Sequence, residues 1–126
     1  MEQISNKQIV VEVYRQLIRD QNLELIDKYV HDDYIQHSPT LKDGKSGLIE
    51  ALSYLKSLPK PPESAPSPIV RIIAEGDLVM AHLDIKFAGK HLAVVDIFRL
   101  KEEKLIEHWS VEQEVPDIMP HGNGMF

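Results

Sequence analysis

The chain contains no cysteine, which excludes disulfides, thiolate metal sites and a cysteine nucleophile. No stretch approaches the ~20 apolar residues that a membrane-spanning helix needs, and the N-terminus lacks the apolar core of a signal peptide. Positive charge is scarce, since 14 Lys and Arg against 20 Asp and Glu give a formal net charge of −6. No basic stripe marks a nucleic-acid surface. We therefore expect a cytoplasmic protein that binds neither nucleic acid nor a membrane.

The rest of the composition is typical of a globular protein, with 43% hydrophobic and 27% charged residues over 126 positions. A chain of this length buries roughly two-thirds of its unfolded surface on folding, so it needs no disulfide or metal to stabilise its core. A Pro-rich stretch, 59–68, contains five of the eight prolines, so neither a helix nor a central strand crosses it. This stretch is too short to separate two domains. We predict one domain over 1–126, with the stretch as an internal connection or a lid.

The hydrophobic periodicity changes at the Pro-rich stretch. Before it, helical spacing predicts three helices within residues 5–58, capped by Ser5, Asn22 and Ser46, with a turn at 31–33 and a short extended piece at 34–37. After it, apolar and polar residues alternate in four strands, which predicts an antiparallel meander over 69–114 and an irregular tail over 115–126. This order predicts an α+β fold in which three helices pack on a curved, mainly antiparallel sheet and enclose a conical pocket.

Asp96 is the first candidate for chemistry because it lies inside the apolar run Val94–Phe98. A carboxylate in such a place is costly unless it is paired, hydrogen-bonded or kept neutral. An ionisable group among apolar neighbours is typical of a functional site. The alternative is a structural acid that backbone amides or Arg99 satisfy, although strand geometry sends Asp96 and Arg99 to opposite faces.

His108 and Ser110 are the second candidates, and their position depends on strand register. If the turn at 101–104 places Arg99 opposite Glu107, then Asp96, His108 and Ser110 share one face of the sheet. A slip of one residue would separate them. An acid and an imidazole among apolar walls are the usual components of a proton-transfer pocket. The alternative for His108 is a half-exposed ring hydrogen-bonded to backbone.

Four further residues are weighed for the same pocket. His37 either joins the proton transfer or faces water from a turn, and His82 either lines the pocket or lies on the solvated face. Tyr14 is either a core residue or a second donor to an oxyanion, and Phe98 is a candidate for substrate contact. His37, His82, His108 and Asp96 could converge on a metal, but no sequential signature supports it. We predict no metal site.

The sequence resembles the SnoaL-like polyketide cyclases, which belong to the nuclear-transport-factor-2-like superfamily together with ketosteroid isomerases. The resemblance covers nearly the whole chain and is most specific at Tyr34–Pro39, Val95–Arg99, Glu107–Trp109 and Asn123–Phe126. It implies a cystatin-like α+β roll with a conical pocket, usually in a homodimer. It also implies that an acidic or histidine side chain moves protons next to a carbonyl.

Two departures from the family pattern limit this inference. The family commonly has His-Trp-Asp where this chain has His108-Trp109-Ser110, so a second carboxylate is missing. The isomerases also carry a carboxylate just before the proline of their short first strand, where this chain has His37 and Ser38. We therefore do not expect steroid isomerisation by the family route.

The first functional hypothesis is an enzyme without a cofactor that moves a proton α to the carbonyl of a small, mostly apolar compound. Asp96 would act with His108 or His37, and the reaction would be a cyclisation, an isomerisation or a dehydration. The second hypothesis is a binding or sensing module that uses the same pocket without chemistry. The third is an assembly role through the outer sheet face near Trp109 and Val111.

Overall fold

The computed structural model describes residues 4–126 and confirms an α+β fold. The N-terminal half contains α1 (Asn6–Glu12), which continues into a π-helix (Val13–Arg19), a 3-10 turn (Leu23–Leu25) that leads into α2 (Ile26–Tyr29), strand β1 (Val30–Gln36) and α3 (Gly44–Lys56). The C-terminal half contains β2 (Ile69–Glu75), β3 (Leu78–Phe87), β4 (Lys90–Lys101) and β5 (Lys104–Glu114). No helix within residues 4–126 has the length and apolar character needed to span a membrane.

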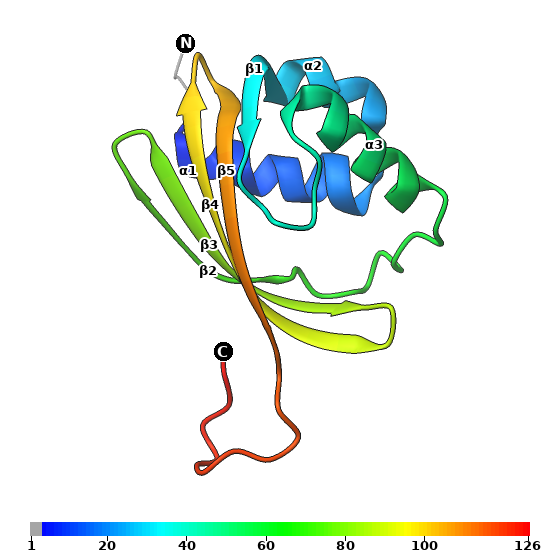
Figure 1. Ribbon diagram of the computed structural model, residues 1–126, viewed down its shortest axis with the longest axis vertical. Helices are drawn as coiled ribbons and strands as arrows, with labels where there is room; N and C mark the ends of the chain where they lie inside the picture. Colours follow the sequence, from blue (N-terminus) through cyan, green and yellow to red (C-terminus); the bar gives the residue numbers. More distant parts are fainter. Residues whose placement is uncertain (1–3) are drawn as a thin grey trace.

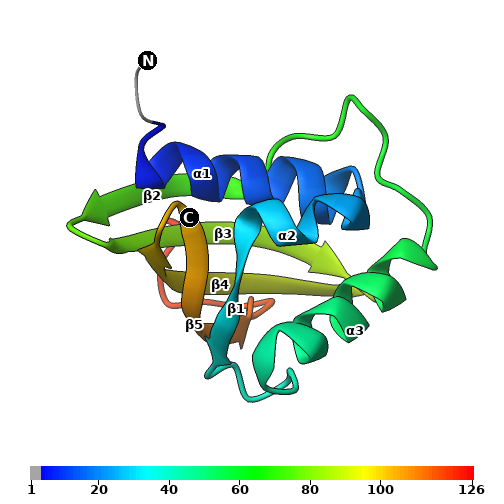
Figure 2. The same ribbon diagram turned by 90° about the horizontal axis from the view of Figure 1, so that it is seen from above.

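The five strands form one sheet in the order β1-β5-β4-β3-β2. Neighbours among β2 to β5 are antiparallel, whereas β1 pairs parallel with β5 at the edge of the sheet. The strands twist strongly along their length, and the helices cover one face (Figures 1 and 2). The predicted arrangement of helices on a curved, mainly antiparallel sheet is therefore confirmed.

The core lies between the helices and the inner face of this sheet. The predicted alternation of β3 is visible in its burial, since Val79, Ala81 and Leu83 are fully buried and point toward the helices. Helical residues at 3.6-residue spacing pack against them, and the core cluster contains Ile9, Val10, Val13, Tyr14, Leu17, Leu52, Val94 and Phe98 among others. This packing positions Tyr14 against the middle of β4.

Two local predictions are wrong. Residues 31–33 belong to β1 and form no turn. They lie in an irregularity between the two places where β1 pairs with β5, at Val30 and again at Ile35 and Gln36. The N-cap of α3 is Asp43 and not Ser46. The Asp43 carboxylate accepts hydrogen bonds from the amides of Gly44, at 2.8 Å, and Gln36, at 2.9 Å. It therefore ties the end of β1 to the start of α3.

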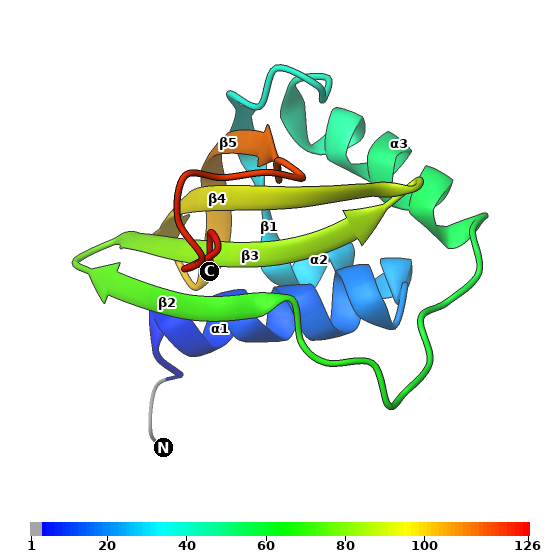
Figure 3. The ribbon, with the colours of Figure 1, turned by 90° about the horizontal axis from the view of Figure 1, so that it is seen from below.

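The tail after β5 has neither helix nor strand and folds back over the outer face of the sheet, across β3 and β4 (Figure 3). The ring of Phe126 lies between two histidine rings, with centroid distances of 5.7 Å to His82 and 5.4 Å to His91. The two faces of the sheet thus have different covers, helices on the inner face and the tail on part of the outer face.

Candidate functional site

The register between β4 and β5 places the candidate residues on one face. Arg99 lies opposite Glu107, and Asp96 therefore lies opposite Ser110. The turn alone does not set this register: it pairs Lys101 with Lys104 and Leu100 with Leu105, and an irregularity between Arg99 and Leu100 then shifts the pairing by one residue. Phe98 is opposite His108 by the same register. Asp96 and Ser110, and likewise Phe98 and His108, lie on the inner face of the sheet. The predicted shared face of Asp96, His108 and Ser110 is therefore confirmed.

Both carboxylate oxygens of Asp96 have partners within the chain. Its Oδ1 lies 2.9 Å from His108 Nε2, and its Oδ2 accepts a hydrogen bond from the Tyr14 hydroxyl. Side-chain exposure is 13% for Asp96 and 9% for His108, so the pair is largely but not completely withdrawn from water. The alternative in which Arg99 satisfies Asp96 is wrong, since that guanidinium binds Asp77 and Glu107 instead.

Tyr14 reaches Asp96 from the π-helical segment that follows α1. Wide π-turns are rare and often occur at functional sites. Burial, the nearby charge of Asp96 and the hydrogen bond to that carboxylate raise the pKa of Tyr14 well above its usual value of 10.0. The hydroxyl is therefore a neutral donor at physiological pH.

Phe98 supports both partners of the acid. Its ring stacks on His108 with centroids 4.6 Å apart, and it meets Tyr14 edge to face at 6.1 Å. Aromatic contacts of this kind fix ring orientation. Phe98 lies within the core and holds the imidazole plane in place.

Gln36 was missed in the sequence, although it completes the site. It lies opposite His108 in the parallel pairing of β1 with β5, and its Oε1 is 2.8 Å from His108 Nδ1. The same oxygen accepts the backbone amide of Ser38 at 3.0 Å, while its Nε2 donates to the Tyr34 hydroxyl at 2.9 Å. Burial raises the pKa of Tyr34 above its usual value, so this hydroxyl also stays neutral. The period of two along the short extended piece, which puts Tyr34 and Gln36 on one face, is the signal that could have found it.

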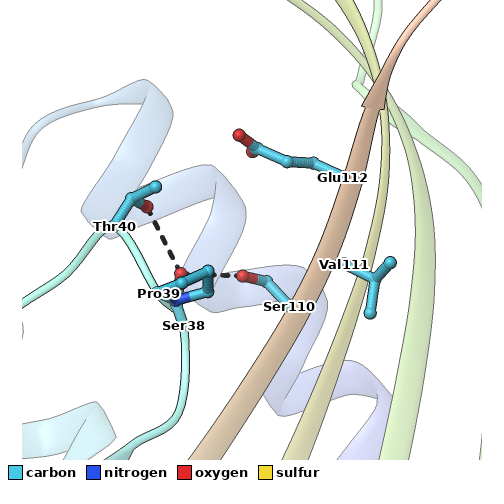
Figure 4. A pocket seen from close by; sticks show the side chains of 6 residues that line it. All are labelled: Ser38, Pro39, Thr40, Ser110, Val111 and Glu112. Atoms are coloured by element: carbon cyan, nitrogen blue, oxygen red, sulfur yellow. Dashed lines mark hydrogen bonds between the residues drawn. The ribbon is translucent and has the colours of Figure 1, made fainter.

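A hollow of about 250 Å³ opens beside this network at the edge of the sheet. Its lining comes from the loop after β1 and from the second half of β5: Ser38, Pro39, Thr40, Ser110, Val111 and Glu112 (Figure 4). Ser110 donates to the Ser38 hydroxyl at 2.8 Å. Ser110 is the direct cross-strand neighbour of Asp96, and neither Asp96 nor His108 is itself part of the lining. A second hollow of about 430 Å³ at the start of α1 and the turn after β4 contains none of the candidate residues.

His37 and His82 do not join this cluster, and their expected placement in the pocket is wrong. Since side chains alternate along a strand, Gln36 faces inward and His37 faces outward. There the His37 ring stacks on Trp109, with centroids 4.9 Å apart, and its Nε2 lies 2.7 Å from the Glu107 carboxylate. His82 lies on the outer face, where it contacts Arg71 and Phe126.

The cluster is a fully satisfied hydrogen-bond network. Within residues 4–126, no buried side-chain nitrogen or oxygen lacks a hydrogen-bond partner. Over the same residues, no three His, Asp or Glu side chains are arranged to hold a metal ion, and Asp96 with His108 contributes only two. What the arrangement offers chemically is an acid, an imidazole and a phenol joined by hydrogen bonds beside a small opening.

Comparison with known proteins agrees with this architecture. The chain matches a candidate polyketide cyclase from Acidithiobacillus ferrooxidans with a TM-score of 0.65 and 20% identity, covering 89% of this chain and 91% of that one. IdmH, a candidate polyketide cyclase from Streptomyces antibioticus, matches with a TM-score of 0.67 and 16% identity over 86% and 92% of the two chains.

A candidate ketosteroid isomerase from Kribbella flavida matches with a TM-score of 0.69 and 10% identity over 92% of this chain and 83% of that one. At these identities the likeness shows a shared fold. No curated protein matches the sequence significantly. The sequence profile of the SnoaL-like domain matches residues 10–108, which include Tyr14, Gln36, Asp96 and His108. The chain therefore belongs to the SnoaL-like domain family.

Proposed function

We propose that this protein is an enzyme that moves a proton next to the carbonyl group of a small, mostly apolar compound. The observation that carries the proposal is the 2.9 Å contact between Asp96 Oδ1 and His108 Nε2 inside an otherwise apolar frame. The Tyr14 hydroxyl on the second carboxylate oxygen supports it, because a neutral phenol can donate to a developing oxyanion. No cofactor enters the proposed reaction.

The proposed step is an enolisation. The C–H bond next to the carbonyl breaks, and its proton passes to the Asp96–His108 pair. A proton held by the pair passes to the carbonyl oxygen, so the pair ends the step with as many protons as it began with. One well-placed acid or base of this kind contributes about 10²–10⁴-fold in rate. Cyclisation, isomerisation and dehydration next to a carbonyl all pass through such an enol.

The size of the hollow at Ser38 and Ser110 is consistent with a small ligand. Its volume of about 250 Å³ is just below the usual range of ligand pockets, which begins at about 300 Å³. Pro39 gives it an apolar wall, and the two serine hydroxyls supply polar contacts on the side of Asp96 (Figure 4). We infer that the ligand enters here and meets the acid past Ser110.

Deuterium exchange tests this proposal with simple ketones in place of the natural substrate. The protein is incubated in D₂O with a panel of small cyclic and aryl alkyl ketones, and deuterium next to the carbonyl is measured by mass spectrometry. We expect exchange above the buffer rate, and we expect Asp96→Asn to lower it by about 10²-fold or more. Asp117→Asn, in the exposed tail, is the matched control and should exchange like the wild type. Equal exchange in Asp96→Asn and wild type would contradict the proposed role.

A second candidate, a binding or sensing module without chemistry, is favoured by one observation. Asp96 and His108 already hydrogen-bond to each other, and Tyr14 and Gln36 occupy the remaining carboxylate oxygen and ring nitrogen. In addition, Ser110 stands where the family commonly has a second carboxylate. Such a network is also what a purely structural buried pair requires. A ligand that copurifies with the protein and is recovered chemically unaltered after prolonged incubation would support this candidate.

A further inference from the structure

The orientation of the Gln36 amide is fixed by its neighbours. The backbone N–H of Ser38 can only donate, and it lies 3.0 Å from Gln36 Oε1. Rotating the amide by 180° would put an NH₂ group against that N–H. The Tyr34 hydroxyl, 2.9 Å from Nε2, provides an acceptor for the amide nitrogen. Gln36 Oε1 is therefore the atom that faces both Ser38 and His108.

This orientation decides which nitrogen of His108 carries hydrogen. Nδ1 lies 2.8 Å from Gln36 Oε1, and an amide oxygen can only accept. The hydrogen bond therefore requires a proton on Nδ1. In a neutral imidazole with that proton in place, Nε2 is an unprotonated acceptor.

A second proton then follows from the contact on the other side of the ring. Nε2 lies 2.9 Å from Asp96 Oδ1, and an unprotonated nitrogen facing a carboxylate oxygen would bring two lone pairs together. One proton must lie between them, either on the ring or on the carboxyl group. The Tyr14 hydroxyl already donates to Oδ2, so it does not supply this proton. The pair therefore holds one proton between an imidazole nitrogen, His108 Nε2, and a carboxylate oxygen, Asp96 Oδ1.

We propose that Gln36 is a positioning residue that fixes the Nδ1–H form of His108 and thereby keeps one transferable proton between His108 and Asp96. This inference rests on the proposed function and deepens it, since it assigns the order of events. The pair meets its ligand already protonated, so its first act is to donate to an oxygen. The ligand class that fits is a compound with a proton-accepting oxygen, such as a ketone.

Nitrogen NMR of the full-length protein tests this inference in the absence of any ligand. Protein labelled with ¹⁵N in its histidines is examined by long-range ¹H–¹⁵N spectra between about pH 6 and 8, where an unperturbed histidine titrates. A His108→Gln spectrum assigns the signals. We expect His108 Nδ1 in the protonated range throughout, and we expect Gln36→Leu to move it to the unprotonated range because the acceptor is gone.

Two further variants separate positioning from general damage. Gln36→Glu keeps an oxygen acceptor opposite Nδ1 and should retain the protonated signal. Gln113→Leu removes an exposed glutamine from the end of β5 and should also match the wild type. Should Gln36→Leu fail to fold, Gln36→Met, which keeps the chain length, takes its place.

An unprotonated Nδ1 in the wild type, or an unchanged Nδ1 signal in the folded Gln36→Leu or Gln36→Met protein, would overturn the inference. Neither result depends on turnover. A protein without deuterium-exchange activity but with a protonated Nδ1 would contradict the proposed function alone, so the two failures are distinguishable.

Discussion

The residues of the site illustrate how a buried acid is tolerated. Asp96 places two carboxylate oxygens near the core, and the chain supplies a partner for each, His108 and Tyr14. Leaving such an oxygen unpartnered would cost about 1–3 kcal/mol. The network therefore contributes to stability as well as to the proposed chemistry, and stability measurements must accompany activity measurements on its variants.

Tyr14 gives a prediction about pH. The raised pKa of Tyr14 in the folded chain means that above about pH 10 the unfolded chain loses the phenolic proton while the folded chain keeps it. The free energy of unfolding should therefore fall with rising pH above that value, by about 1.4 kcal/mol per pH unit for each such tyrosine. Urea unfolding between pH 9 and about pH 11 measures this slope. Tyr34, whose pKa is also raised, adds a second contribution.

Tyr14→Phe should reduce that slope to what Tyr34 provides, and it should lower stability below pH 9 by about 1–3 kcal/mol, since one oxygen of Asp96 loses its donor. Tyr54→Phe is the matched control, because Tyr54 is exposed on α3. It should leave both the slope and the stability unchanged within about 0.5 kcal/mol. An identical slope in Tyr14→Phe and wild type would show that Tyr14 ionises normally.

Sequence reasoning found Asp96 but not Gln36, and the difference has a physical cause. Asp96 is conspicuous because its neighbours in the chain are apolar, so the cost of burial can be inferred locally. Gln36 lies between Ile35 and His37 in a short segment of mixed character that does not mark it as buried, and its partner His108 is 72 positions away. Only the parallel pairing of β1 with β5 brings the two together.

At the scale of elements, α3 is held against the preceding loop by a close backbone approach at Gly47. A Cβ atom at this position would overlap the carbonyl oxygen of Lys42. We predict that Gly47→Ala lowers the free energy of unfolding by about 1–3 kcal/mol, because the loop must move away from the helix. This loss opposes the gain in helix propensity of about 1 kcal/mol from Gly to Ala.

Gly122→Ala is the matched control, since an added Cβ there meets nothing within 4 Å. It should change stability by less than about 0.5 kcal/mol. Thermal or urea unfolding of the two variants side by side measures the difference. A Gly47→Ala protein as stable as Gly122→Ala would mean that the contact with Lys42 relaxes without cost.

Elements with strong periodicity were predictable, and those set by remote partners were not. The alternation in β3 follows from local pattern, whereas the register of β4 with β5 depends on an irregularity between Arg99 and Leu100 that the short turn does not predict. The π-helix over Val13–Arg19 and the strand over 31–33 carry no such pattern. Both depend on how the first helix and β1 pack against the rest of the sheet.

At the scale of the whole molecule, the outer sheet face carries several exposed apolar side chains. Val111 is 70% exposed there, and Ile73 and Ile35 lie exposed on the same face. Exposed apolar side chains on one sheet face are candidate contacts for association. The expectation of a homodimer thus remains a prediction with a defined surface.

We predict that analytical ultracentrifugation shows a dimer for the wild type, and that Val111→Lys shifts the mass to the monomer because it places a charge in the interface. Tyr54→Lys, on the surface of α3 away from the outer sheet face, is the control and should stay dimeric. A wild type that is monomeric at all concentrations would contradict the prediction.

The sequence by itself determined the fold class, the antiparallel arrangement of the last four strands and the candidacy of Asp96, because these depend on composition, period and the local cost of burying a charge. The tertiary structure alone decided that Tyr14 and Gln36 complete the site while His37 and His82 leave it. The reason is that the inner or outer position of each side chain is set by strand pairing and helix packing between distant segments. Those contacts depend on the three-dimensional fit of the whole chain, which no local pattern encodes.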